Sequence, residues 1–262
     1  NEESHPQFFD ALIMRIRTML SDSRMMSVAT DDGNVTLTKW LTDFIGGDES
    51  SNGNVSVIDL SLVPQEIIHV VTAVISRVTF EALQRYKRKT GSVLPTTLVM
   101  EEAHNFIKRY RDDTDDVSSS SICCQVFEKI AREGRKFGLG LMLSSQRPSE
   151  LSPTVLSQCN TFLLHRITND KDQEMVAKLL PDGLRGLIKE IPALPSQHAF
   201  LIGWATELPV LTKLRELEKG MRPNSDDPEF WNVWTRKDKN SEKVERRIDW
   251  QAIANEWQEI PE

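Results

Sequence analysis

Residues 97–106 read TLVMEEAHNF, a short apolar run that ends in two consecutive carboxylates, Glu101 and Glu102. The run predicts a buried strand over 97–100, because apolar and β-branched residues favour strands and the acids end the pattern. In open α/β sheets, ligands bind beyond the carboxyl ends of the strands. One acid could hold Mg²⁺ there, and the other could orient or deprotonate a water molecule. The alternative is a strand that runs into a helix whose N-terminus the two acids stabilise.

Similar apolar runs lie on both sides of this stretch, and segments with helical spacing separate them. Further strands are predicted over 55–60, 139–144, 161–165 and 199–202. Helices are predicted over 6–30, 64–88, 122–136 and 171–180. Alternating strands and helices indicate an α/β fold, with a mostly parallel sheet that is covered by helices on both faces.

A second polar segment surrounds the predicted strand over 139–144. The strand is followed by Gln146, and a strand-end glutamine beside an acid-bearing strand suits a γ-phosphate sensor or a water-positioning group. The turn before the strand carries Arg132 and Arg135. Such an exposed turn suits an arginine finger, which stabilises charge on a transferring phosphoryl group. The alternatives are a strand-capping hydrogen bond for Gln146 and a solvated basic helix end for the arginines.

Three stretches together resemble the ATPase core of HerA-type hexameric DNA translocases, which are relatives of FtsK. They are VIDLS at 57–61, EEAHNF at 101–106, and the span from AREGRKFG at 131–138 to SQRP at 145–148. The resemblance covers roughly residues 6–215. It implies a RecA-like P-loop ATPase core, a homohexameric ring with double-stranded DNA in its pore, and ATP and Mg²⁺ as cofactors. It also implies a nuclease or a sirtuin-like NADase effector as partner, in DNA processing or anti-phage defence.

The resemblance assigns roles to matching positions. Glu101 matches the acid that contacts the nucleotide and holds Mg²⁺ through water. Glu102 matches the catalytic glutamate, and Gln146 matches the sensor. Arg132 or Arg135 would be an arginine finger that acts on a neighbouring subunit, and Arg166 a second phosphate contact.

Other polar residues near the double acid permit weaker interpretations. Lys108, Arg109 and Arg111 begin a charged loop that could touch DNA phosphates in a ring pore. Neighbouring aspartates in the same loop would repel DNA, so a solvated surface loop is the alternative. His104 has no histidine partner at metal-ligand spacing, and we expect it to organise the acids by a hydrogen bond.

One part of such an ATPase is not found in these residues. None of the twelve glycines is followed by lysine, so the phosphate-binding motif G-x-x-x-x-G-K-[ST] is absent. The chain begins at Asn1, and the resemblance places this loop upstream. We therefore expect residues 1–213 to be the C-terminal part of an ATPase core that is inactive alone. The alternatives are a catalytically incomplete scaffold that assembles a ring and docks an effector, or a related conjugation or DNA-packaging ATPase.

The composition narrows the class of protein. The 262 residues are 27% charged and 39% hydrophobic with a net charge of −7, which indicates a soluble, globular chain and argues against one coated with nucleic acid. The longest apolar stretch, 67–75, is interrupted by polar residues, so no membrane span is expected. Three cysteines, of which Cys123 and Cys124 are adjacent, indicate a packing role in a reduced, cytoplasmic setting.

The last segment differs in character from the rest. Residues 214–262 hold four of the six tryptophans and many charged residues. They predict an extension that packs on a neighbouring subunit. The alternative is an ordinary C-terminal helix pair on its own core.

Overall fold

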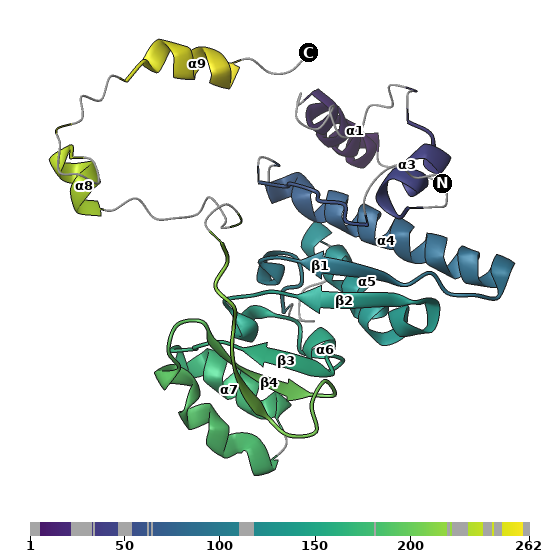
Figure 1. Cartoon of the computed structure of the whole chain (residues 1–262). Coiled ribbons are helices and arrows are strands. Elements are labelled where there is room, and N and C mark those ends of the chain that lie inside the picture. Colours follow the sequence, from purple (N-terminus) through teal and green to yellow (C-terminus); the bar gives the residue numbers. More distant parts are fainter. Residues whose placement is uncertain are drawn as a thin grey trace. The chain divides into compact units, whose positions relative to one another are not determined.

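The structure is a computed structural model of the chain (Figure 1), which forms two compact units, residues 1–214 and 215–262. The residues that the structure describes are 6–21, 33, 35–46, 54–61, 63, 65–109, 118–180, 182–218, 221, 230–237, 243 and 248–258. Each unit is described by itself.

The described part of the first unit begins with the helices α1 (Pro6–Ser21), α3 (Leu37–Phe44) and α4 (Gln65–Thr90). The predicted helix over 6–30 is confirmed as far as residue 21, and 22–30 lie outside the described residues. The Thr36 hydroxyl caps α3 by accepting a hydrogen bond from the Lys39 backbone N–H at 3.2 Å. Basic residues fill the last turn of α4, where the helix dipole favours cations.

A parallel pair of strands forms the first sheet: β1 (Thr96–Met100) and β2 (Leu139–Leu143), in register from Thr96 opposite Leu139 to Met100 opposite Leu143. The crossover between them contains η1 (Ala103–Asn105), α5 (Ser119–Glu133) and η2 (Gly134–Phe137). Alternate side chains of both strands pack on α4 and α5, around the buried Phe80, Phe127 and Ile130. Figure 1 shows α4 beside this sheet.

The expectation of helices on both faces of the sheet is met on one face only. Val99 of β1 and Met142 of β2 point to the other face, and both side chains are exposed. Within the described residues, α4 and α5 both pack on the Leu98 and Leu141 side, which leaves this second face uncovered.

The rest of the first unit contains a second sheet and the helices that connect its strands. After η3 (Pro148–Glu150) and α6 (Pro153–Leu156), its strands are β3 (Thr161–Leu164), β4 (His198–Gly203) and β5 (Val210–Lys213). Helix α7 (Asp170–Leu179), η4 (Asp182–Lys189) and η5 (Ile191–Ala193) connect β3 to β4. Leu164, Val176, Ile191 and Phe200 belong to the core of this region.

All strand pairs of the second sheet are antiparallel, so the α/β class is confirmed but the expected parallel pairing is wrong here. Only six residues join β4 to β5, and so short a connection permits a hairpin but no parallel crossover. Gly203 ends β4 with φ +110°, where a Cβ would lie 2.1 Å from the Asn160 carbonyl oxygen. That close approach fixes β4 against the start of β3.

The strand predicted over 55–60 does not form. Val55 and Val57 are 81% and 85% exposed, and Leu60 alone packs partly against the core. A strand needs a neighbour for its backbone N–H and C=O groups, and in the described part of the chain none pairs with this segment. A turn follows at once, since the Asp59 carboxylate accepts a hydrogen bond from the Ser61 N–H at 2.9 Å. This hydrogen bond also lowers the pKa of Asp59.

Helix α4 bears on the expectation that no segment of the chain spans a membrane. Within Ile67–Thr90, an 18-residue window has a mean hydropathy of 1.3, so this helix could cross a membrane by length and composition alone. Ile67, Phe80 and Leu83 on this helix are nevertheless buried against the rest of the first unit. Core packing therefore accounts for the apolar side chains on one face of α4, whereas Val70 and Val74 on the same helix are exposed.

The cysteine prediction is confirmed where the structure tests it. Cys123 and Cys124 are buried on α5, both as free thiols. Burial raises the pKa of each to about 12, so both stay protonated at neutral pH. Their surroundings suit packing rather than reactivity.

The second unit contains α8 (Phe230–Thr235) and α9 (Trp250–Gln258). None of its residues whose burial the structure describes is buried, and Trp231, Trp234 and Trp250 are 74%, 71% and 70% exposed. The Phe230 ring contacts both tryptophans of α8, with centroids 5.6 and 5.4 Å away. The packing of residues 214–262 on a neighbouring subunit stays a prediction.

Candidate functional site

The candidate site lies at the carboxyl ends of β1 and β2. Because the strands are parallel and in register, the residues that follow Met100 and Leu143 meet at one edge of the sheet. Backbone bonds extend this pairing past the strands. The Ser144 N–H donates to the Met100 carbonyl, and the Ala103 N–H donates to the Ser144 carbonyl, both at 2.9 Å. The loop after each strand is therefore fixed to the other.

Glu102 has an unusual backbone conformation at this edge. Its φ of 47° and ψ of 45° are left-handed, which costs a residue with a Cβ about 1–2 kcal/mol. The conformation starts η1, where the Asn105 N–H donates to the Glu102 carbonyl at 2.8 Å. Strained backbone of this kind concentrates at functional sites.

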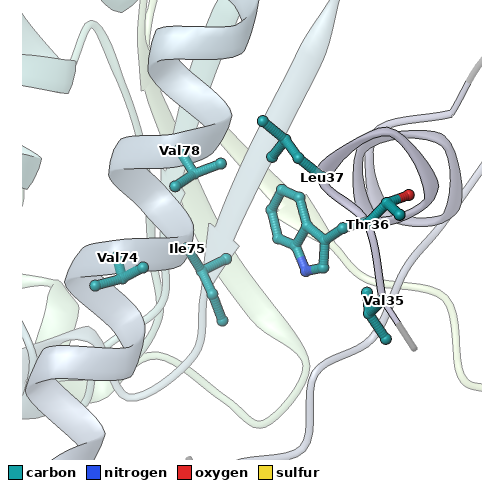
Figure 2. Close-up of a pocket in the computed structure, with 7 residues that line it drawn as sticks. Val35, Thr36, Leu37, Val74, Ile75 and Val78 are labelled. Carbon is teal, nitrogen blue, oxygen red and sulfur yellow. The ribbon is translucent and has the colours of Figure 1, made fainter. Parts of the chain in front are cut away.

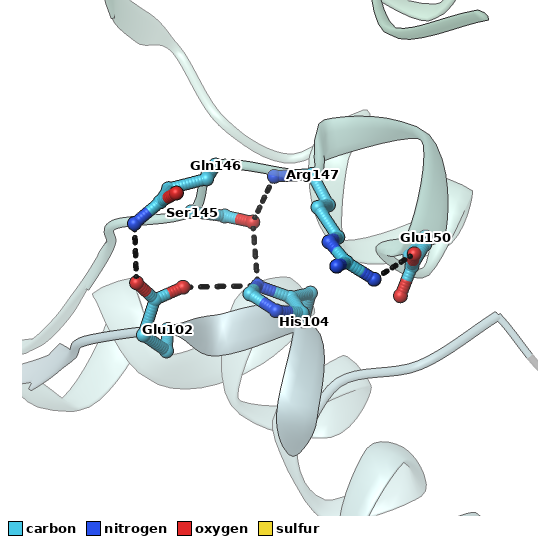
Figure 3. Close-up of polar contacts among 6 residues, drawn as sticks. All are labelled: Glu102, His104, Ser145, Gln146, Arg147 and Glu150. Carbon is cyan, nitrogen blue, oxygen red and sulfur yellow. Dashed lines mark hydrogen bonds and ion pairs between the residues drawn. The ribbon is translucent and has the colours of Figure 1, made fainter.

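The Glu102 side chain meets Gln146 across the two strands (Figure 3). Gln146 Nε2 donates a hydrogen bond to Glu102 Oε1 at 2.8 Å. These residues were predicted from separate stretches of sequence, and the structure brings them into direct contact. The side chain of Glu102 remains 41% exposed, so solvent or a ligand can reach it.

His104 contacts the second oxygen of the same carboxylate, as its expected organising role requires. Its Nδ1 lies 3.3 Å from Glu102 Oε2 and 3.1 Å from Ser145 Oγ. A lone pair on Nδ1 would face the negative carboxylate, so the contacts favour a proton on Nδ1 that is shared between the two oxygens. The His104 side chain is 12% exposed, and its placement limits the positions open to Glu102.

The loop after β2 is held by its own polar contacts. Ser145 Oγ accepts a hydrogen bond from the Arg147 backbone N–H at 3.0 Å, and the Arg147 guanidinium donates to Glu150 Oε1 at 3.0 Å. The Ser149 N–H donates to the buried carboxylate of Asp172 on α7 at 2.9 Å. Gln146 therefore stands in a fixed loop (Figure 3).

Glu101 is exposed and makes no hydrogen bond or ion pair with any described residue. The described residues contain no cluster of three or more histidine, cysteine or carboxylate side chains that could enclose a metal ion. Mg²⁺ does not need such a cluster, since it commonly keeps several waters and binds one or two carboxylates together with substrate phosphates. An unpaired carboxylate at a strand end fits that way of holding Mg²⁺.

The two arginines considered as fingers lie on different elements. Arg132 is on α5, where its guanidinium is 4.0 Å from the Glu128 carboxylate. Glu128 is buried and accepts a hydrogen bond from Ser152 Oγ at 2.6 Å. Arg135 is on η2 and exposed, and its guanidinium has no polar partner in the described part of the chain.

Other predicted site residues are not gathered at the Glu102–Gln146 contact. Arg166 is exposed just beyond β3, a strand of the second sheet. Lys108 forms an isolated antiparallel bridge with Leu151, and the Arg109 N–H donates to the Glu150 carbonyl at 2.8 Å. Their exposed side chains leave the DNA-contact hypothesis untested, and Arg111 lies outside the described residues.

Sequence reasoning missed several residues that support the site. They are Ser145, Glu150 and Asp172, which bind His104, Arg147 and the Ser149 backbone respectively. Ser145 adjoins Gln146 in the motif, which could have drawn attention to it. Asp172 lies in the first turn of α7, where a carboxylate is ordinary, so no local pattern distinguishes it.

An apolar hollow lies between the start of α3 and the middle of α4 (Figure 2). It has a volume of about 280 Å³, and Val35, Leu37, Val74, Ile75 and Val78 are among its lining residues. It contains no charged side chain, so it does not suit a phosphate-bearing ligand.

An α/β sheet with a glutamate and a glutamine at the ends of adjacent parallel strands is the arrangement expected of a nucleotide-hydrolysing protein. Comparison with known proteins agrees with this class. The chain is 31% identical over 189 residues to the DNA double-strand break repair helicase HerA of Pyrococcus furiosus, an alignment that covers 62% of this chain and 33% of that protein. It is 27% identical over 214 residues to HerA of Sulfurisphaera tokodaii, covering 80% and 41%.

A probable helicase of Methanocaldococcus jannaschii is 33% identical over 158 residues, covering 59% of this chain and 29% of its own length. The resemblance to HerA-type helicases is therefore confirmed, although the chain spans only about a third of the length of these relatives. No family model matches the chain. Among solved structures, a genome packaging NTPase from Sulfolobus turreted icosahedral virus 2 has a TM-score of 0.41 at 18% identity, covering 56% of this chain and 63% of the packaging protein.

Proposed function

We propose that the chain is part of an ATP-driven DNA translocase or helicase subunit of a HerA-like hexameric ring. The contact between Glu102 and Gln146 is the observation that carries the proposal. It places a carboxylate and an amide at the edge of a parallel sheet, where a nucleotide phosphate would bind. The similarity to HerA DNA repair helicases supports the same activity.

In this proposal each polar residue of the site has one task. Glu102 accepts a proton from an attacking water, and Gln146 orients that water through its amide group. His104 holds the Glu102 carboxylate in place by its contact with Oε2, and Ser145 in turn contacts His104. Glu101 would hold Mg²⁺ through water, and a bound Mg²⁺ neutralises charge on the phosphate oxygens.

The 262 residues contain no G-x-x-x-x-G-K-[ST] motif. The proposal therefore includes a phosphate-binding loop from outside these residues, and a polypeptide of residues 1–262 alone should not hydrolyse ATP. It further includes a cytoplasmic location, and a nuclease or a sirtuin-like NADase as the effector that works with the ring in DNA processing or anti-phage defence.

The test is ATP hydrolysis by the full-length protein, with and without double-stranded DNA. A DNA translocase should hydrolyse ATP faster when DNA is present, and it should displace a third strand from a triplex in an ATP-dependent reaction. An equal rate without DNA, together with no displacement, would contradict the translocase function.

The second candidate is a catalytically incomplete scaffold that assembles a ring and docks an effector. The missing phosphate-binding motif is the observation in its favour. The full-length protein would then assemble without hydrolysing ATP. The intact Glu102–Gln146 contact favours the enzyme, because a scaffold does not require that geometry.

A further inference from the structure

The turn over 134–138, which carries Arg135, is fixed to the first sheet at both of its ends. At Gly134 a Cβ would lie 2.7 Å from the Leu139 carbonyl oxygen, so the turn starts in close contact with β2. Gly138 has φ +81°, and its carbonyl accepts a hydrogen bond from the Thr96 N–H of β1 at 2.9 Å. The backbone of this turn therefore has little freedom to move.

Lys87, in the last turn of α4, supplies a third attachment. Its ammonium donates a hydrogen bond to the Lys136 carbonyl at 2.7 Å and lies 5.7 Å from the centroid of the Phe137 ring. The Phe137 ring packs edge-on against Phe80 of the same helix, with centroids 5.7 Å apart. Carbonyls in the last turn of a helix have no intrahelical hydrogen-bond partner and carry partial negative charge. An ammonium group supplies the missing hydrogen bond and is attracted by the charge.

The two arginines near this turn differ in how well they meet the requirements of an arginine finger. A finger must offer an unpaired guanidinium from a fixed backbone, because it has to reach a phosphoryl group on another molecule. The guanidinium of Arg132 faces the buried Glu128 carboxylate of its own helix. The guanidinium of Arg135 is exposed and has no polar partner among the described residues. Lys87 binds the carbonyl of Lys136, which is the residue directly after Arg135.

The resemblance to HerA-type translocases offers Arg132 and Arg135 as the finger, and these contacts favour Arg135. We infer that Lys87 is a positioning residue that acts through Arg135. Lys87 touches no nucleotide. It sets the peptide unit beyond Arg135 and so the direction in which the guanidinium leaves the turn. This inference rests on the proposed ATPase function.

The first test measures steady-state ATP hydrolysis by full-length rings with Lys87→Met, which removes the donor and keeps most of the side chain. A misplaced finger should lower kcat about tenfold and leave KM for ATP nearly unchanged, because the lost interaction forms only in the transition state. Lys87→Arg keeps a cationic donor and should recover most of kcat. The matched control is Arg88→Met, the next cation of the same turn, which is exposed and should leave both constants unchanged.

A double-mutant cycle separates positioning from a general loss of structure. If Lys87 acts through Arg135, adding Lys87→Met to Arg135→Ala causes no further fall in kcat. A further fall in that background would overturn the inference. So would full kcat in Lys87→Met, or loss of activity in Arg132→Ala while Arg135→Ala stays active.

Amide hydrogen exchange gives a readout that does not depend on ATP. Exchange over residues 134–138 should be faster in Lys87→Met and unchanged in Arg88→Met, and equal exchange in both variants would refute the attachment itself. A wild-type protein that hydrolyses no ATP would refute the proposed function. An active wild type with an unaffected Lys87→Met variant would refute the positioning role alone.

Discussion

At the scale of single residues, the site depends on a glutamate that holds an uncommon backbone conformation. The left-handed Glu102 starts η1 directly after β1, and its carboxylate meets Gln146 and His104. The identities of these residues could be predicted, because acids and an amide follow apolar strands in the sequence. The left-handed turn could not, since a non-glycine residue adopts it only when surrounding hydrogen bonds require it.

A glycine-to-alanine pair tests how tightly the turn over 134–138 is built. Gly138→Ala introduces a Cβ 2.9 Å from the Leu94 carbonyl oxygen at a φ of +81°, so it should lower the free energy of unfolding by about 1–3 kcal/mol. Gly183→Ala is the control, because nothing lies within 4 Å of its added Cβ. Urea denaturation of both variants measures the difference, and equal midpoints would show that the turn relaxes freely.

At the scale of helices and strands, the elements that could be predicted from the sequence are those whose regularly spaced apolar side chains pack into the core. Helix α4 and strands β1 and β2 lie where apolar spacing indicated, since their inward side chains form the core. Residues 55–60 have the composition of a strand but no hydrogen-bonded neighbour in the described residues, and composition cannot report a neighbour. Strand β5 was missed because Val210–Lys213 is too short to show alternation.

The buried thiols of α5 predict how stability changes with pH. In the folded chain the pKa of Cys123 and that of Cys124 are raised from 9.0 to about 12, so the folded state keeps protons that the unfolded state loses. The resulting stability is complete below pH 9 and falls as the pH rises from about 9 to 12. The free energy of unfolding, measured by urea denaturation, should therefore be lower at pH 10.5 than at pH 8.

The control for this effect is a Cys123→Ala/Cys124→Ala variant measured at the same two pH values. Its free energy of unfolding should depend less on pH than that of the wild type, even if it is lower throughout. An identical pH dependence in the two proteins would show that the thiols do not cause the change.

At the scale of the whole molecule, the chain combines a unit with a hydrophobic core and a second unit with no buried residue among those whose burial is described. The α/β class could be predicted from the alternation of strands and helices, and the similarity to HerA from three motif stretches. The antiparallel second sheet could not, because the pairing direction depends on connections rather than on the strands themselves. The hexamer, the DNA substrate and the effector remain proposals.

Removing residues 215–262 tests whether the tryptophan-rich unit serves assembly. Trp231, Trp234 and Trp250 are exposed, and burying them between subunits would remove a large apolar area from water. We expect the shortened protein to fold but to form fewer rings in sedimentation velocity. Ring formation equal to that of the intact protein would contradict a role in subunit contact.

The most direct measurement is kcat for ATP hydrolysis by full-length protein with Glu102→Gln. This change preserves the size of the side chain and removes its ability to accept a proton. We predict that kcat falls at least about 100-fold while ATP affinity and ring assembly are retained. Glu81→Gln on the exposed side of α4 is the control and should hydrolyse ATP normally. A Glu102→Gln variant that hydrolyses ATP at the wild-type rate would contradict the account.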